Sequence, residues 1–289
     1  MEKEIKTIKL EDKEYPPLLK KIANPPKILY IKGELSKKEK CFAIVGTRRA
    51  SSYGKEIAFS IAKDLSEAGL TIVSGMARGI DTFAHKGALE GGGKTIAVLG
   101  TGIDEKSIYP KENLNLARKI LENKGCLVSE YPPESPGWKQ NFPERNRIIA
   151  GLSWGVLVVE AKFGSGALIT ANWAKKYRRK VFAVPGSIHF PNSQGCHFLI
   201  KQGAKLIEKA DDILKELNLP CLTSGVKQAK GKTLEEQLIL ETLKQENLHI
   251  DKIIEKTKLS PQIVSSILTL MEIESKVKNL GGNVYVITR

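Results

Sequence analysis

The sequence lacks the cysteine spacing of metal and redox sites. Its four cysteines, Cys41, Cys126, Cys196 and Cys221, include no C-x-x-C pair, and such pairs are typical of zinc sites and thiol redox motifs. Cys41 and Cys126 begin apolar segments of strand length, which is typical of buried thiols. We therefore expect no metal site.

Long apolar segments are also missing. The longest, Gly155–Val159, has the length of a strand, whereas a membrane-spanning helix needs about 20 apolar residues. The first residues, MEKEIKTIKLEDKEY, are polar and contain no apolar core of a signal peptide. We expect a soluble, cytoplasmic protein with no membrane partner.

Acidic residues are too few to balance the basic ones. Lys and Arg total 46 against 32 Asp and Glu, which gives a formal net charge of +14. An excess of this size indicates an anionic partner, and without membrane signals nucleic acid is favoured. The excess lies in the first 232 residues, because Thr233–Arg289 has seven basic against eight acidic residues.

The glycine patterns of nucleotide-binding loops are absent as well. The segment Gly46-Thr-Arg-Arg-Ala-Ser51 lacks two of the three glycines of the dinucleotide fingerprint G-x-G-x-x-G. The segment Gly91-Gly-Gly-Lys-Thr95 approaches a phosphate loop but leads into a strand, whereas a phosphate loop opens a helix. We expect neither nicotinamide chemistry nor ATP hydrolysis, and no cofactor.

What the sequence does contain is an alternation of apolar segments and amphipathic helices. Continuous apolar segments are typical of parallel strands that are covered on both faces, and the alternation predicts an α/β fold with a doubly wound, mostly parallel sheet. The predicted strands are Phe42–Val45, Leu70–Val73, Thr95–Leu99, Cys126–Val128, Val156–Val159 and Lys180–Val184; the predicted helices are Tyr53–Ala68, Asp81–Leu89, Asn113–Asn123 and Ala167–Tyr177.

The pattern divides the chain into four parts. Residues 1–40 form a proline-containing approach segment, residues 41–217 the α/β domain, residues 218–232 a linker, and residues 233–289 a small C-terminal domain. In the last part, three helices near 234–245, 250–256 and 261–271 precede a hairpin around Gly281-Gly282, which predicts a winged helix. Its lack of net positive charge makes protein contact at least as plausible there as DNA contact.

Candidate binding residues follow the predicted strands. Ligands of doubly wound sheets bind at the carboxyl ends of the strands. There Arg48 and Arg49 follow Gly46 and Thr47, and arginine can grip a phosphate or stack on a base. Ser165-Gly166, near a helix start, offers a second anion site.

The segment Trp138–Arg147 interleaves aromatic and cationic side chains. Single-stranded nucleic acid needs both, because cations neutralise phosphates and aromatic faces stack on unpaired bases. Arg145 and Arg147 are two residues apart, so on a helix they point in different directions, and one can reach a ligand while the other is structural. The alternative is that Phe142 is a core anchor and that the arginines pair with Glu144 and Glu160.

No residue set predicts catalysis strongly. Asp81 and His85 share a helix face, but a helix-start aspartate and a structural histidine explain them better. The alternative enzyme is a nucleoside-monophosphate-cleaving protein of Rossmann type, which uses a Pro-Gly-Gly loop and a nearby glutamate. Here the corresponding loop is Phe163-Gly-Ser-Gly166, and Glu160 lies upstream of it.

Several long motifs resemble the DNA-processing protein A (DprA, or Smf) family. The resemblance covers nearly all of residues 15–217, and the C-terminal part is similar to the winged helix of many members. The motifs are Ala43-Ile-Val-Gly-Thr-Arg-Arg, Ser74-Gly-Met-Ala-Arg-Gly-Ile-Asp-Thr-Phe-Ala-His-Lys-Gly-Ala-Leu89, Phe142-Pro-Glu-Arg-Asn-Arg-Ile-Ile-Ala-Gly-Leu-Ser153, Val158-Val-Glu160 with Ser165-Gly-Ala-Leu-Ile-Thr-Ala171, and Val181-Phe-Ala-Val-Pro-Gly186.

The resemblance implies a Rossmann-like fold and a non-catalytic role. It implies a homodimer that binds single-stranded DNA, protects incoming strands during natural transformation and loads RecA recombinase. The family's Gly-x-Arg falls on Gly46 and Arg48, and its phosphate- and base-contacting lysine and phenylalanine fall on Lys139 and Phe142. The expected DNA-binding residues are together Gly46, Thr47, Arg48, Arg49, Lys139, Phe142, Arg145, Asn146, Arg147, Ser165 and Gly166.

Overall fold

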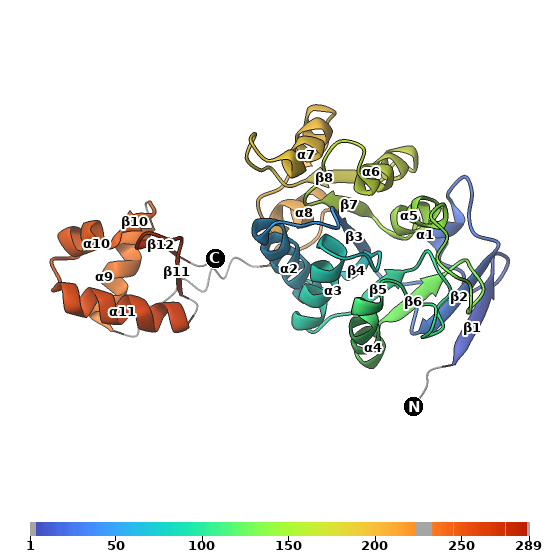
Figure 1. The fold of residues 1–289 in the computed structure, drawn as a ribbon, viewed down its shortest axis with the longest axis horizontal. Coiled ribbons are helices and arrows are strands. Elements are labelled where there is room, and N and C mark those ends of the chain that lie inside the picture. Colours follow the sequence, from blue (N-terminus) through green and yellow to red (C-terminus); the bar gives the residue numbers. More distant parts are fainter. Residues whose placement is uncertain (1–3, 223–232, 245, 275, 288–289) are drawn as a thin grey trace. The chain divides into compact units, whose positions relative to one another are not determined.

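The chain divides into two compact units, residues 1–222 and 223–289, in the computed structural model (Figure 1). The structure describes residues 4–222, 233–244, 246–274 and 276–287. Each unit is described by itself below.

A nine-stranded sheet forms the centre of the first unit, in the order β1-β2-β6-β5-β4-β3-β7-β8-β9. Neighbours from β6 to β9 run parallel, whereas β1 and β2 join one edge in antiparallel fashion. The strands are β1 (Ile5–Lys9), β2 (Ile28–Gly33), β3 (Cys41–Val45), β4 (Thr71–Ser74), β5 (Thr95–Val98), β6 (Cys126–Ser129), β7 (Gly155–Val158), β8 (Lys180–Ala183) and β9 (Lys205–Leu206).

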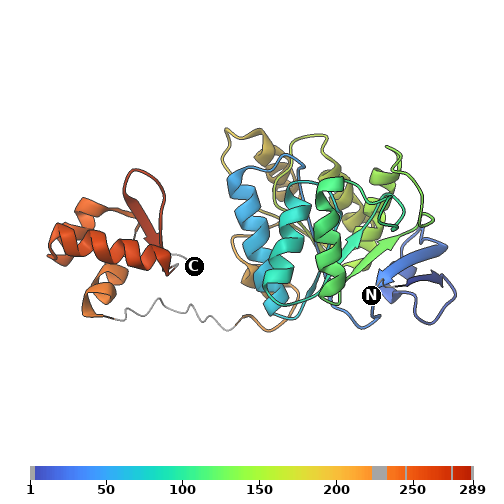
Figure 2. The ribbon, with the colours of Figure 1, turned by 60° about the horizontal axis from the view of Figure 1, so that its bottom comes forward.

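Helices cover both faces of this sheet (Figures 1 and 2). One face packs against α1 (Pro17–Lys20), α5 (Asn141–Leu152), α6 (Gly166–Lys176) and α7 (Pro191–Lys201). The other face packs against α2 (Ser52–Glu67), α3 (Ile80–Glu90), α4 (Leu114–Glu122), which follows the short turn η1 (Lys111–Asn113), and α8 (Ala210–Glu216).

The predicted α/β fold is confirmed, because its apolar strands are buried on both faces. All residues of β3, β4, β5, β6 and β7 are buried, as a sheet covered on both faces requires. Two strands of the sheet, β1 and β2, lie in the predicted approach segment, where no strand was expected. β1 has no buried residue and lacks the continuous apolar pattern by which the other strands were found. β2 does begin with Ile-Leu-Tyr-Ile, but it follows Pro25-Pro26 and was therefore included in the approach segment.

The strand order places a topological switch point beside β3. From β3 the chain proceeds through β4, β5 and β6 on one side, and it then returns to lay β7, β8 and β9 on the other. At such a point the loops that follow the two central strands diverge and leave a crevice. Here these loops follow β3 at Val45 and β7 at Val158.

The second unit has the predicted winged-helix arrangement. A three-stranded antiparallel sheet, in the order β10-β12-β11, packs against three helices around a separate core that includes Ile239, Leu268 and Tyr285. Ser260 caps the third helix by accepting from Ile263 N. The elements are α9 (Leu234–Leu243), β10 (Leu248–His249), α10 (Ile250–Thr257), α11 (Pro261–Ile273), β11 (Val277–Asn279) and β12 (Val284–Ile287).

Most of the predicted linker lies outside the described residues. Of residues 218–232, only 218–222 are described, and Leu219 and Leu222 pack against the core on the α2 side of the sheet. In the part of the chain that the structure describes, we find no helix that is both long and apolar enough to span a bilayer.

Candidate nucleic-acid interface

Backbone hydrogen bonds to two neighbouring segments fix the turn that follows β3. Thr47 N donates to Glu160 O at 2.8 Å, and Thr47 O accepts from Ile80 N at 3.2 Å. A Cβ at Gly46 would lie 2.4 Å from Ile80 Cγ1, and a Cβ at Gly79, where φ is +76°, would lie 2.3 Å from Thr47 O. Both glycines are therefore needed for close packing of this turn, from which Arg48 protrudes.

A groove of about 1070 Å³ runs along the carboxyl edge of the sheet at the switch point. It brings together ten of the eleven predicted DNA-binding residues, from the turn after β3, the segment leading into α5, the first turns of α5 itself, and the start of α6. These residues are Gly46, Thr47, Arg48, Arg49, Lys139, Phe142, Arg145, Asn146, Ser165 and Gly166.

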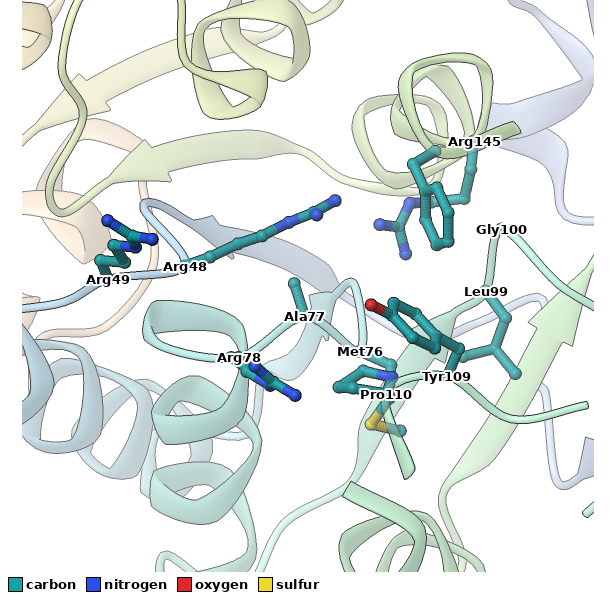
Figure 3. Close-up of a pocket in the computed structure, with 11 residues that line it drawn as sticks. Arg48, Arg49, Met76, Ala77, Arg78, Leu99, Gly100, Tyr109, Pro110 and Arg145 are labelled. Carbon is teal, nitrogen blue, oxygen red and sulfur yellow. The ribbon is translucent and has the colours of Figure 1, made fainter. Parts of the chain in front are cut away.

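A cation and two aromatic rings lie close together in this groove. The Arg48 guanidinium carbon lies 5.5 Å from the centre of the Phe142 ring, and the Phe142 and Tyr109 ring centres are 5.8 Å apart. A narrower pocket of about 200 Å³ opens between them, with Arg48, Tyr109 and Arg78 projecting into the region from different loops (Figure 3). The groove therefore presents charge and stackable rings within one short stretch.

An arginine and an aspartate form the floor of the groove and are 5% and 6% exposed, respectively. Arg145 donates to Val98 O and, from Nε, to Asn146 Oδ1 at 3.2 Å. Arg145 and Asp81 flank Gly75, where a Cβ would lie 2.5 Å from Asp81 Oδ2 and 2.7 Å from Arg145 Nη1. Burial raises the pKa of Asp81 to about 6, with the Arg145 charge opposing the rise.

Arg147 is the one predicted residue that the structure does not bring to the groove. Its guanidinium forms two hydrogen bonds to the Glu130 carboxylate, at 2.7 and 2.6 Å, and both side chains are largely buried. Arg145 and Arg147 are about 200° apart around α5, so only Arg145 faces the groove. We leave Arg147 out of the proposed site.

The groove also contains cations and an aromatic ring that the sequence analysis missed. Lys106, Lys111 and Tyr109 come from the loop after β5, and Lys162 comes from the loop after β7. The rule that ligands bind at carboxyl ends could have found them, because both loops follow predicted strands. Their segments also mix cations with aromatic residues, since Lys106 and Lys111 flank Tyr109 and Lys162 precedes Phe163, but this mixture is shorter than the one at Trp138–Arg147 and was passed over.

The residues considered for catalysis have structural partners. The Glu160 carboxylate accepts from Ser51 N at 3.0 Å and from the Ser51 hydroxyl, so it holds the start of α2. His85 is fully buried, its Nε2 donates to Gly75 O at 2.6 Å, and burial lowers its pKa to about 4. Among the described residues there is no cluster of three or more His, Cys, Asp or Glu side chains that could hold a metal.

The opposite pKa shifts of Asp81 and His85 lead to a testable pH dependence. The Asp81 pKa is raised to about 6, so its contribution to stability is present below its ordinary pKa and is lost as pH rises past 6. The His85 pKa is lowered to about 4, so its contribution is present above its ordinary pKa and is lost as pH falls toward 4. The two dependences therefore oppose each other in the wild-type protein.

In the Asp81→Asn variant, the pH dependence of stability that arises from His85 should no longer be offset by that of Asp81. The free energy of unfolding of the variant, relative to wild type, should rise by about 2 kcal/mol between pH 4.5 and pH 7. Urea unfolding at the two pH values measures this difference. Parallel pH dependences of the two proteins would show that the Asp81 carboxyl titrates as it does in the unfolded chain.

Comparison with known proteins places the chain in one family. Residues 6–218 match the family model for DNA recombination-mediator protein A, and residues 227–283 match the DprA winged helix domain. The chain is 45% identical over 218 residues to DNA processing protein DprA of Bacillus subtilis, covering 75% of this chain and 72% of that protein. It is 48% identical over 204 residues to Protein Smf of Escherichia coli, covering 70% of this chain but only 54% of that protein.

Solved structures agree with this assignment. The X-ray structure of DNA processing protein A from Streptococcus pneumoniae has a TM-score of 0.69 at 44% identity and covers 74% of each chain. A structure from Helicobacter pylori, which addresses the single-stranded DNA binding mode of its DNA processing protein A, has a TM-score of 0.66 at 30% identity and covers 75% of this chain and 98% of that one. The chain therefore belongs to the DNA recombination-mediator protein A family, also known as DprA or Smf.

Proposed function

We propose that this protein binds single-stranded DNA in the groove at the carboxyl edge of the sheet. The observation that carries the proposal is the convergence of Arg48, Lys139 and Phe142 on one groove together with further cations. Arg48 and Lys139 neutralise phosphates, and Phe142 stacks on an unpaired base. The binding mode described for the Helicobacter pylori relative supports the same ligand class.

The shape of the site favours a single strand over a duplex. Phe142 and Tyr109 lie at the mouth of a pocket of about 200 Å³, and only a base that is not held in a base pair can turn its face toward such rings. An electrophoretic shift assay with one oligonucleotide, alone and annealed to its complement, should show clear preference for the single strand.

The biological role that we propose is protection of incoming single strands and loading of RecA recombinase during natural transformation. The protein would act in the cytoplasm as a homodimer and without catalysis, as the family resemblance implies. Loading can be tested with DNA that is coated by single-strand-binding protein: addition of this protein should shorten the delay before RecA-dependent strand exchange begins. An unchanged delay would argue against loading.

The charge distribution also makes a prediction about the second unit. Residues 233–289 carry seven basic and eight acidic residues, so the unit contributes little to phosphate binding. Truncation of the chain after Leu222 should change the dissociation constant for single-stranded DNA by less than about twofold, as measured by fluorescence anisotropy. A much larger loss of affinity would place part of the DNA surface in the second unit.

A further inference from the structure

The third helix of the second unit, α11, presents an apolar stripe that its own unit does not cover. Ile263, Leu270 and Ile273 are 43%, 57% and 74% exposed, and the small residue Ser266 lies between them on the same side. The opposite side of α11 is buried through Val264, Leu268 and Met271, so the exposed stripe is additional to the core-facing one.

The chemistry of this stripe is unsuited to nucleic acid. The segment Pro261–Ile273 contains no lysine and no arginine, whereas a helix that docks into a DNA groove relies on cationic and polar side chains for phosphates and bases. An exposed apolar stripe on a helix is instead typical of a protein-contact surface. We therefore infer that the stripe contacts a protein rather than nucleic acid.

The spacing of the stripe is the same when read in either direction. Its members follow one another at intervals of three, four and three residues, from Ile263 through Ser266 and Leu270 to Ile273. An antiparallel copy would place Ile263 of each helix against Ile273 of the other, and the small Ser266 of each against the large Leu270 of the other. Each of these two contacts therefore occurs twice in the pair. We propose that α11 is a self-association surface through which two copies of this chain pair their α11 helices in antiparallel orientation.

The charges at the two ends of α11 support a second copy as the occupant. The first turn contains no acidic residue and the last turn no basic residue. Glu272 and Glu274 lie at the C-terminal end, where Lys276 pairs with Glu274 at 2.7 Å and Glu272 accepts from Asn279 N. This is the reverse of what the helix dipole prefers. In the antiparallel pair, the acidic end of each helix lies beside the positive N-terminal end of the other, so pairing relieves the mismatch at both ends.

The interface is small, so the association should be weak. A stable interface buries about 800 Å² on each partner, and one stripe of four residues provides less. We expect pairing to become effective where copies are held close together, because a high local concentration offsets a weak dissociation constant. The surface is separate from the groove of the first unit, so its test does not depend on DNA binding.

Disulfide cross-linking in the full chain tests both the surface and the orientation. In a Cys221→Ser background, which leaves Cys41, Cys126 and Cys196 buried, chains with Ser266→Cys are mixed with tagged chains carrying Leu270→Cys and oxidised. The mixed disulfide should form about tenfold more efficiently than in a matched mixture of Ser265→Cys with Leu270→Cys, because disulfides require close Cβ atoms. Ile273→Asp in both chains should reduce the mixed disulfide about tenfold.

Several results would overturn the proposal. Equal yields from Ser265→Cys and Ser266→Cys would mean random collision, and a Ser266→Cys homodisulfide in excess of the mixed one would mean a parallel pair. An unchanged yield with Ile273→Asp would mean contact through another surface, and absence of any cross-link would mean that α11 faces a different partner. Because Ile273 is 74% exposed, its replacement should leave the thermal unfolding midpoint unchanged, which verifies that the variant is folded.

Discussion

Replacement of Arg48 with alanine should weaken binding of single-stranded DNA by about 10–100-fold. Arg48 projects from a turn that is held by Thr47 and Ile80, so its guanidinium reaches a phosphate at little cost in conformational entropy. The loss should be about equal for every base sequence, because phosphate and stacking contacts carry little sequence information. Fluorescence anisotropy with several oligonucleotides measures both the size and the uniformity of the effect.

The salt dependence of binding separates a direct phosphate contact from a general loss of charge. Each phosphate contact contributes about 0.7 to the slope of log affinity against log salt for single strands, so Arg48→Ala should lower the slope by about that amount. Arg118→Ala is the matched control, because Arg118 is exposed, pairs with Glu105 and lies outside the groove. Equal losses of affinity and slope in the two variants would remove Arg48 from the site.

Replacement of Arg145 with methionine should lower the free energy of unfolding by about 2–4 kcal/mol at pH 7. The change leaves the buried Asp81 carboxylate without its neighbouring cation and Val98 O without its donor. Methionine occupies similar space, so the loss reflects charge and hydrogen bonding more than a cavity. Urea unfolding monitored by circular dichroism measures it.

Protonation of Asp81 should rescue part of that loss. The carboxyl pKa is about 6 in the wild-type protein, and removal of the arginine raises it further, so at pH 5 the group is neutral in the variant. We therefore expect a smaller difference between Arg145→Met and wild type at pH 5 than at pH 7. The double variant Asp81→Asn/Arg145→Met should be more stable at pH 7 than Arg145→Met alone, and equal stability would contradict the coupling.

The sequence predicted the strands of the fold better than their arrangement. The buried strands β3 to β7 were recognised from continuous apolar residues, which depend only on local pattern. The position of β7 beside β3 depends on contacts between distant segments, which no local pattern contains. The edge strand β1 was missed because its exposed residues resemble those of a loop. The inner strand β2 was missed because its apolar start follows Pro25-Pro26 in a segment that was interpreted as an approach to the sheet.

The site shows the same division between local and distant information. Helical geometry predicted that Arg145 and Arg147 point in different directions, but it could not say which faces the ligand. The ion pair with Glu130, which follows β6, explains why Arg147 faces away from the groove in a largely buried position. The environment of Asp81 likewise depends on Gly75 and Arg145, and only the folded chain brings the three together.

The most direct test of the central claim is to map where a single strand lies on the protein. An oligonucleotide that carries 5-iodouracil can be photo-cross-linked to the wild-type chain and the attached residues identified by mass spectrometry. Because iodouracil reacts readily with aromatic side chains that stack on it, we predict attachment at Phe142 or Tyr109, the two rings of the groove. Attachment confined to the second unit, or to the Glu130–Arg147 side of α5, would contradict the account.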